Sequence, residues 1–136
     1  MPIKTYKGKI PDGLQKRIRL STSDGMTGYR IKSFKIISPT PGTNTCELLA
    51  KIYTTNQDNS ITGAVDFNEP DLLAVSYFAI AASTFSVDDY IVFDKEVFNQ
   101  DIYITASDNS GNTIETNYYL ELEQIKLNMG SWLGNS

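Results

Sequence analysis

The chain has 136 residues, of which 40% are hydrophobic and 21% charged, and its formal net charge is −4. This length suits a single domain that buries a sizeable core without a metal or a disulfide, and the recurring aromatic and aliphatic residues are untypical of a disordered chain. The acidic balance argues against broad nucleic-acid binding.

The first predicted strands lie in a basic stretch that two turns interrupt. Residues 3–10 form a short basic strand candidate. Pro11-Asp12-Gly13 follows as a turn, because proline fixes φ and glycine permits a positive φ. Residues 16–21 alternate basic with apolar side chains, as a half-exposed strand does. Ser23-Asp24-Gly25 predicts a second turn.

The next strand candidate, residues 28–37, contains a change of phase. Tyr29 and Ile31 occupy one parity, whereas Phe34 and Ile36 occupy the other. A regular strand cannot bury both sets on one face. The pattern therefore predicts either a β-bulge near Lys32-Ser33 or partial cover on both faces.

Residues 46–52 show the most regular alternation in the middle of the chain. Cys46, Leu48, Ala50 and Ile52 share one parity, whereas Glu47 and Lys51 occupy the other. This pattern predicts an amphipathic strand whose charged face meets solvent. After a polar loop, residues 64–67 are expected to pair briefly.

The second half of the chain predicts a buried strand, a short strand and a hairpin. Residues 72–80 are apolar on both parities, which favours a central strand covered on both faces, with a short helix as the alternative. Residues 90–93 predict a short strand. Residues 102–106 and 115–127 alternate regularly around the turn-rich segment 108–112, which predicts a β-hairpin.

Seven to nine short strands with little helix predict an all-β fold. We expect a single antiparallel β-sandwich over residues 1–127, with jelly-roll-like or immunoglobulin-like connections, followed by a Gly-rich tail at 128–136. Tyr103 and Tyr119 have outward parity on the two strands of the predicted hairpin. They are expected to form an aromatic cross-strand pair.

The charge is distributed unevenly along the sequence. Residues 1–35 hold nine of the twelve basic residues and only two acids, whereas the remainder is strongly acidic. Either folding mixes the two sets, or the surface is bipolar and binds copies of itself head to tail or an acidic partner. The candidate assembly contacts of the basic segment are Lys4, Lys7, Lys9, Arg17 and Arg19.

Trp132 and Leu133 are the remaining candidate assembly contacts. They follow the last predicted strand in the Gly-rich tail, where a core role is not obvious. Either this pair anchors the tail in a neighbouring subunit, as buried aromatics often do at interfaces, or the tail folds back on its own domain.

Catalytic and metal-binding patterns are scarce. The chain has no histidine and one cysteine, Cys46, so His-based triads and most zinc sites are excluded and no internal disulfide can form. We interpret Cys46 as a buried structural thiol. The remaining candidate catalytic carboxylates are Asp88, Asp89, Asp94, Glu96 and Asp101. Acids in such loops are usually solvated, so we expect a non-enzymatic protein without a cofactor.

The segment 108–112 superficially suggests a calcium loop. It lacks the glycine at the sixth position and the acid at the twelfth, which are Thr113 and Tyr119 here. A hairpin loop is therefore the favoured interpretation.

Three segments carry a resemblance to a known group of proteins. They are STSDGMTGYRI (residues 21–31), IVFDKEVFNQDIYIT (91–105) and NYYLELE (117–123). Together they resemble small, mostly uncharacterised proteins of marine tailed bacteriophages, over about residues 3–125. The resemblance implies a virion component, such as a capsid decoration, vertex or tail-associated protein, and it carries over no catalytic motif.

These observations predict how the protein acts and where. We expect a virion structural protein that assembles with itself and with capsid or tail proteins. A glycan- or cell-surface-binding module is the alternative, because aromatic and Asn/Asp-rich loops recur. No apolar run reaches the roughly 20 residues of a membrane helix, and the first residues lack the apolar stretch of a signal peptide. Synthesis in a host cytoplasm is therefore expected, with no membrane or nucleic-acid partner.

Overall fold

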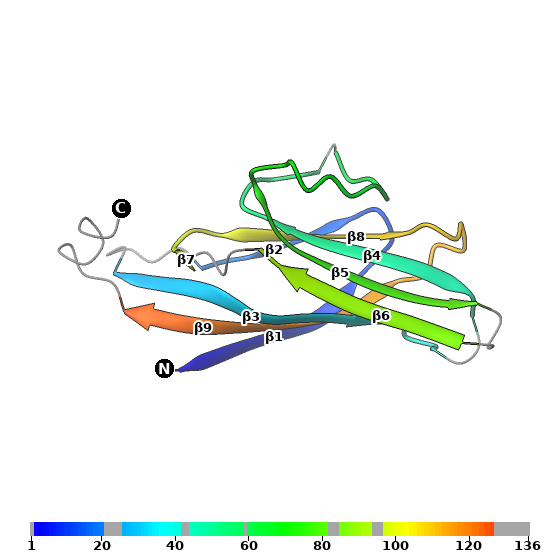
Figure 1. Cartoon of the computed structure of the whole chain (residues 1–136), viewed down its shortest axis with the longest axis horizontal. Coiled ribbons are helices and arrows are strands. Elements are labelled where there is room, and N and C mark those ends of the chain that lie inside the picture. The colour runs from blue at the N-terminus through cyan, green and yellow to red at the C-terminus, as the bar shows by residue number, and fades with distance from the viewer. Residues whose placement is uncertain are drawn as a thin grey trace.

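In a computed structural model of the chain, residues 2–20, 26–41, 44–58, 60–81, 85–93 and 97–126 are described. The strands in these residues are β1 (Ile3–Ile10), β2 (Gln15–Ile18), β3 (Thr27–Ile37), β4 (Cys46–Tyr53), β5 (Leu72–Ala81), β6 (Phe85–Val92), β7 (Val97–Phe98), β8 (Ile102–Asp108) and β9 (Thr116–Lys126). They form two facing layers (Figure 1), which confirms the predicted β-sandwich. None of the described residues belongs to a helix that could cross a membrane.

The strand order is that of a jelly roll. Sheet A has the order β1-β9-β3-β7 and sheet B the order β2-β8-β4-β5-β6. Strands pair from the two ends of the sequence inward: β1 with β9, β2 with β8, β3 with β7 and β4 with β5, always antiparallel. A folded-back chain wrapped into two sheets in this way is the jelly-roll arrangement. Of the two connection types compatible with the sequence, the jelly roll is therefore the one that forms.

Strand β6 is an addition to this eight-stranded wrap. It pairs antiparallel with β5 and extends sheet B by a fifth strand. The sequence signal covered only residues 90–93, whereas the strand begins at Phe85. Because β6 has one neighbour, it is the edge of sheet B opposite β2.

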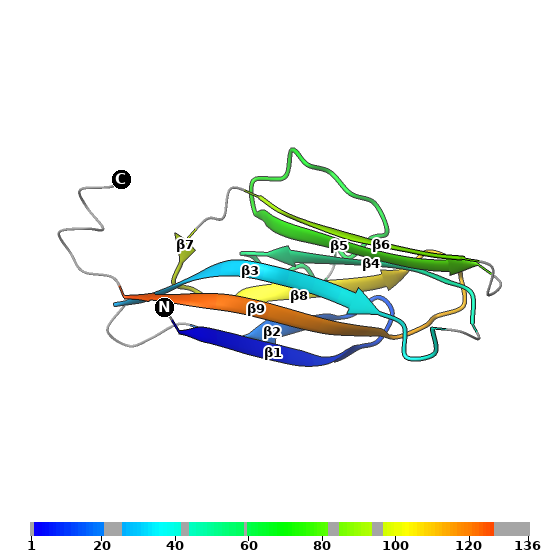
Figure 2. The same ribbon diagram turned by 60° about the horizontal axis from the view of Figure 1, so that its bottom comes forward.

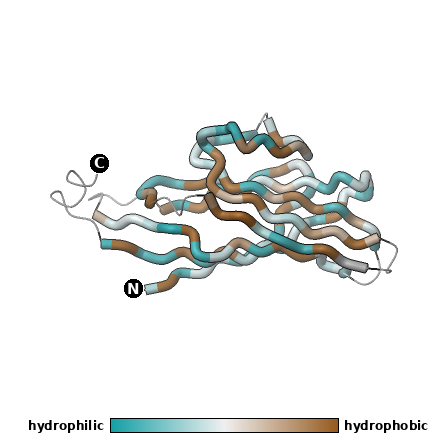
Figure 3. Tube along the Cα trace, viewed as in Figure 1, coloured by the Kyte–Doolittle hydropathy of each residue, from teal (hydrophilic) through white to brown (hydrophobic). Residues whose placement is uncertain are grey.

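The core fills the space between the inward faces of the two sheets. Apolar runs follow the strands of both layers (Figure 3). The largest fully buried apolar side chains of the described residues are Ile10, Phe34, Leu48, Ile52, Ile102, Ile104, Leu120 and Leu122. Burying each such side chain stabilises the fold by about 1.5–3 kcal/mol, so alternation along the strands largely determines the architecture. Cys46 is buried in this core, as predicted.

A β-bulge accounts for the change of phase in β3. Ile31 pairs with Leu122, but the next pair joins Ser33 to Glu121, so Lys32 is the extra residue. Lys32 is exposed, while Ile31 and Phe34 are both buried. The bulge thus places both apolar sets on the core face.

The predicted hairpin of β8 and β9 is wrong. β8 lies between β2 and β4 in sheet B, and β9 lies between β1 and β3 in sheet A. Residues 109–115 therefore cross from one sheet to the other. Two strands that face each other across a core show the same alternation as two paired strands, so the pattern alone could not distinguish them. Tyr103 and Tyr119 consequently lie on different sheets and form no cross-strand pair.

The outer face of sheet B is covered, contrary to the prediction for β4. Residues 54–71, which we call the strap, pass over this face (Figure 1), and residue 59 is outside the described part. The strap contains no strand at 64–67 in the described residues. Lys51 is therefore only 2% exposed instead of solvated. The two-sided burial predicted for residues 72–80 is confirmed in β5.

Two predictions fall on residues that are not described. The turn at 23–25 and the tail at 128–136 lie outside the described residues. The division of the chain into a sandwich and a tail remains a prediction.

Candidate functional site

The basic N-terminal residues lie along one side of the sandwich. β1 and β2 are the first strands of their sheets, and a turn joins them in which the Leu14 N–H donates to the Pro11 carbonyl and Gly13 has a φ of 81°. Figure 2 shows these two strands on the side opposite β5 and β6. We call this side the basic edge, and its exposed charged residues are Lys4, Lys7, Lys9, Lys16, Arg17 and Arg19.

Two lysines of the basic edge have the parity of core residues. Lys4 pairs with Leu122, and Lys16 pairs with Ile104, and both partners are fully buried. The lysines themselves are exposed at the rim of the core. Inward-pointing charges on an edge strand discourage the addition of another strand. Lys4 and Lys16 therefore disfavour backbone pairing of a further strand at this edge.

The opposite side of the sandwich has acidic character. On β6, Asp88 and Asp89 are both exposed, and Asp88 has inward parity because it pairs with Phe78. Val87 and Ile91 are exposed on the outward parity of the same strand. We call these four residues of β6 the acidic edge. The basic edge likewise exposes two apolar side chains beside its charges, Ile3 and Leu14.

Folding neutralises part of the basic segment. Among the described residues, the ion pairs are Arg17–Asp101 at 2.6 Å, Arg30–Glu123 at 2.5 Å and Lys9–Glu115 at 3.9 Å. The Arg30 guanidinium holds the pKa of Glu123 below its usual range. Lys4, Lys7 and Arg19 form no ion pair within the described residues. Folding therefore mixes part of the charge, and Lys4, Lys7 and Arg19 remain as unpaired charges at the basic edge.

The candidate catalytic carboxylates do not converge. Asp101 accepts hydrogen bonds from Arg17 and from the Leu20 N–H, beside β2. Asp88 and Asp89 lie on β6, and two strands separate β6 from β8. Asp94 and Glu96 lie outside the described residues, as do Trp132 and Leu133. Within the described residues, no two of these carboxylates face each other across a cleft.

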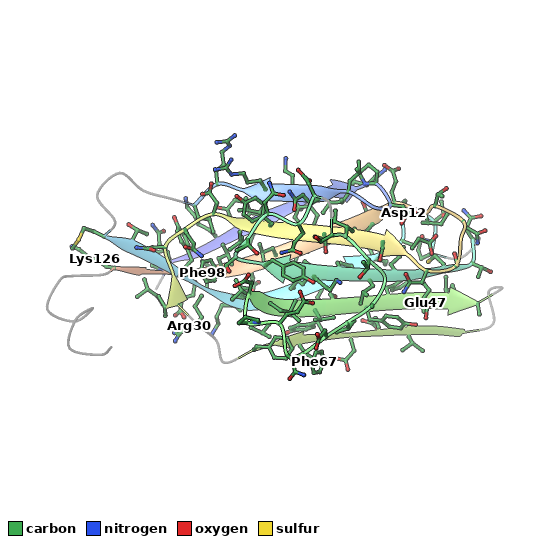
Figure 4. All side chains as sticks on the ribbon, turned by 90° about the horizontal axis from the view of Figure 1, so that it is seen from above. Asp12, Arg30, Glu47, Phe67, Phe98 and Lys126 are labelled. Carbon is green, nitrogen blue, oxygen red and sulfur yellow. The ribbon has the colours of Figure 1, made fainter. Side chains whose placement is uncertain are left out.

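Asp108 has a structural role at the end of the sandwich marked by Asp12 and Glu47 in Figure 4. Its carboxylate accepts hydrogen bonds from the N–H groups of Glu47, Ser110 and Ile114, at 3.1, 2.9 and 2.9 Å, and from the Ser110 hydroxyl at 2.7 Å. Burial alone would raise the pKa of Asp108, but these donors hold the pKa below its usual value. Asp108 thus fastens the connection between the sheets. No metal-binding cluster of acids or cysteine occurs in the described part of the chain.

The strap is held by polar contacts that sequence reasoning did not find. The Lys51 Nζ donates to the Ala64 carbonyl at 2.6 Å, and the Tyr53 hydroxyl donates to Glu69 at 3.3 Å. Burial lowers the pKa of Lys51. Burial and the nearby Glu69 raise the pKa of Tyr53 to about 12. The only sequence signal was the length of the polar segment, which exceeds that of an ordinary hairpin loop.

The strap also leaves apolar surface beside the acidic edge. Phe67 is 59% exposed, and its ring packs edge-to-face on Phe93 with centroids 5.0 Å apart. In Figure 4, Phe67 lies on the β6 side of the molecule. Exposed apolar residues next to charges are typical of protein–protein contact surfaces.

Comparisons with known proteins give no relative from which a function could be transferred to this chain. No family model matches the chain, and no curated protein matches it either.

Proposed function

We propose that this protein is a non-enzymatic structural component of a bacteriophage particle, such as a capsid decoration, vertex or tail-associated protein. It assembles through contacts with copies of itself and with capsid or tail proteins. The observation that carries the proposal is the placement of the basic edge and the acidic edge on opposite sides of one rigid sandwich. The resemblance to phage proteins is the reason for assigning the protein to a phage particle.

The two edges suit a head-to-tail contact between copies. In such a contact the basic edge of one copy meets the acidic edge of the next, so opposite charges approach while exposed apolar residues on both sides are covered. Because the two surfaces differ, the contact is heterologous, and repeated contacts produce a ring or an open array. The jelly roll also occurs in viral capsid proteins, which is support by fold analogy alone.

Light scattering after size-exclusion chromatography at low and high salt tests the assembly step. We expect oligomers at low salt that dissociate as salt screens the charges. Lys4→Glu with Lys16→Glu should give a monomer, and so should Asp88→Lys with Asp89→Lys. An equimolar mixture of the two double variants should recover oligomers in which the variants alternate, because the two native edges pair with each other and the two reversed edges complement each other.

A matched control changes the net charge equally at other sites. Lys32→Glu with Lys126→Glu alters two exposed lysines outside the two edges and should leave the oligomers intact. A monomeric wild-type protein at low salt would argue against self-assembly. Mass spectrometry of purified phage particles tests whether the protein is a virion component, and its absence from the particles would refute the virion role.

A further inference from the structure

The outer face of sheet A has an exposed tyrosine at its centre. Tyr119 lies on β9, an interior strand, and its side chain is 39% exposed. Its hydroxyl donates to the Glu121 carboxylate at 2.8 Å, which fixes the direction of the ring. The tyrosine is therefore an oriented aromatic surface on a rigid sheet.

Lysines flank this tyrosine on both neighbouring strands. Lys7 on β1 and Lys35 on β3 pair directly with Tyr119 in the sheet register. Both are exposed, and neither forms an ion pair within the described residues. Because neighbouring strands lie about 4.8 Å apart, the two lysine backbones are separated by about 10 Å, with the tyrosine between them.

A shallow groove runs along each side of Tyr119. The first, of about 510 Å³, lies between β1 and β9 and is lined by Lys7, Gly8, Lys9, Asn117, Tyr118 and Tyr119. The second, of about 310 Å³, is lined by residues of β9 and β3 and by Asp88 from β6 of sheet B, and its other additional lining residues are Lys35, Ile36 and Ile37. Both grooves combine an aromatic wall with a cation and an amide.

We propose that this face binds an acidic polysaccharide, with Tyr119 packed against a sugar ring and Lys7 and Lys35 bound to carboxylate or sulfate groups on either side. An aromatic ring offers an apolar surface to the C–H face of a sugar, and lysine is a point charge that suits such anions. Asn117 and Asp88 supply hydrogen-bond partners for hydroxyl groups.

The surrounding charges favour a polysaccharide over a nucleic acid. Glu121 lies two residues from Tyr119 on the same strand face, and Asp88 lines the second groove. A nucleic acid carries a phosphate at every residue and would be repelled by these carboxylates. A polysaccharide with one acidic group per disaccharide places its charges at the lysines and its hydroxyl groups at the carboxylates.

Isothermal titration calorimetry with hyaluronan and unsulfated chondroitin oligosaccharides, which carry one carboxylate per disaccharide, tests this inference, with neutral chito-oligosaccharides and a thymidine oligonucleotide as comparison probes. Binding to the acidic oligosaccharides should weaken as salt increases. Tyr119→Ala should reduce affinity by roughly tenfold, the scale of one base–aromatic stacking contact, whereas Tyr119→Phe, which keeps the ring but loses its hydrogen bond to Glu121, should reduce it less. Lys35→Gln should weaken binding, and Lys32→Gln, an exposed lysine of the same strand outside the grooves, should not.

Circular dichroism must show that each variant is folded. Absence of binding to both acidic probes would overturn the inference, as would equal affinity of Tyr119→Ala or tighter binding of the oligonucleotide. The proposed face shares Lys7 with the basic edge and Asp88 with the acidic edge, so variants outside the grooves separate this inference from the assembly proposal. The double variant Lys4→Glu with Lys16→Glu should still bind these oligosaccharides, since neither lysine lines the grooves.

Discussion

Replacing Asp108 by asparagine should cost a large part of the stability of the sandwich. Asp108 is 7% exposed, and its carboxylate accepts hydrogen bonds from three backbone N–H groups and one hydroxyl. In Asp108→Asn, one oxygen becomes an amide donor that faces a backbone N–H, and the other bonds lose their charge. A bond to a charged group is worth about 1.5–3 kcal/mol and a neutral one about 0.5–1.5 kcal/mol. The expected loss is therefore on the order of 3 kcal/mol.

Urea denaturation at several pH values measures this loss. The pKa of Asp108 is lower in the folded state than in the unfolded state. The Asp108 carboxylate therefore contributes its full stabilisation of the fold above the unfolded pKa, about 3.9, and this stabilisation is lost as pH falls through the folded pKa. The difference between wild type and Asp108→Asn should thus be largest at pH 7 and should shrink in acid. Asp58→Asn, in an exposed part of the strap, is the control. A loss below about 0.5 kcal/mol at pH 7, which is typical of surface substitutions, would refute this account of the connection.

Three further predictions concern the bulge, the thiol and the strap. Deleting Lys32 should preserve a cooperative thermal transition, since Lys32 is the extra residue of the bulge. Deleting Lys35 should abolish folding, because the side chains that follow it in β3 would change face. A cooperative transition in both deletion variants would contradict the register of β3. Burial raises the pKa of the Cys46 thiol, so a thiol reagent should label it no faster than the chain unfolds, and rapid labelling of folded protein would contradict its burial. Burial lowers the pKa of Lys51, so as pH rises the Lys51 ammonium loses its proton in the folded state before it does so in the unfolded state. The free energy of unfolding should therefore rise with pH between the folded and unfolded pKa values of Lys51. Lys51→Met should lack this rise in urea titrations, and an identical rise in the variant would assign it to other groups.

The sequence predicted those parts of the fold that depend on local alternation. The change of phase between Ile31 and Phe34 located the bulge, because a period-two pattern can reverse only where a residue is added. The double-sided burial of β5 followed from its continuous apolar run. Both features depend on the residues of a single strand and can be predicted without knowing which strands pair with it.

Features that depend on partner strands were beyond the sequence. The alternation of β8 and β9 fits a hairpin as well as two facing sheets, and the pairing is decided by the competition among all strands. The burial of Lys51 depends on the path of the strap, which few of its polar residues specify. The basic edge was anticipated as a set of residues, whereas the acidic edge on β6 became visible only when the strand order placed it opposite β1 and β2.

The position of β9 within sheet A has a consequence for the biogenesis of the protein. β9 is the last described strand in sequence, yet it is the only partner of β1 and the main partner of β3. While residues 116–126 are still within the ribosome, the β4–β5–β6 meander can form, but the apolar faces of β1 and β3 have no strand to complete their sheet. The sandwich therefore closes only after synthesis of nearly the whole described chain, and until then the exposed apolar surface and unpaired strand edges of the emerging polypeptide favour aggregation.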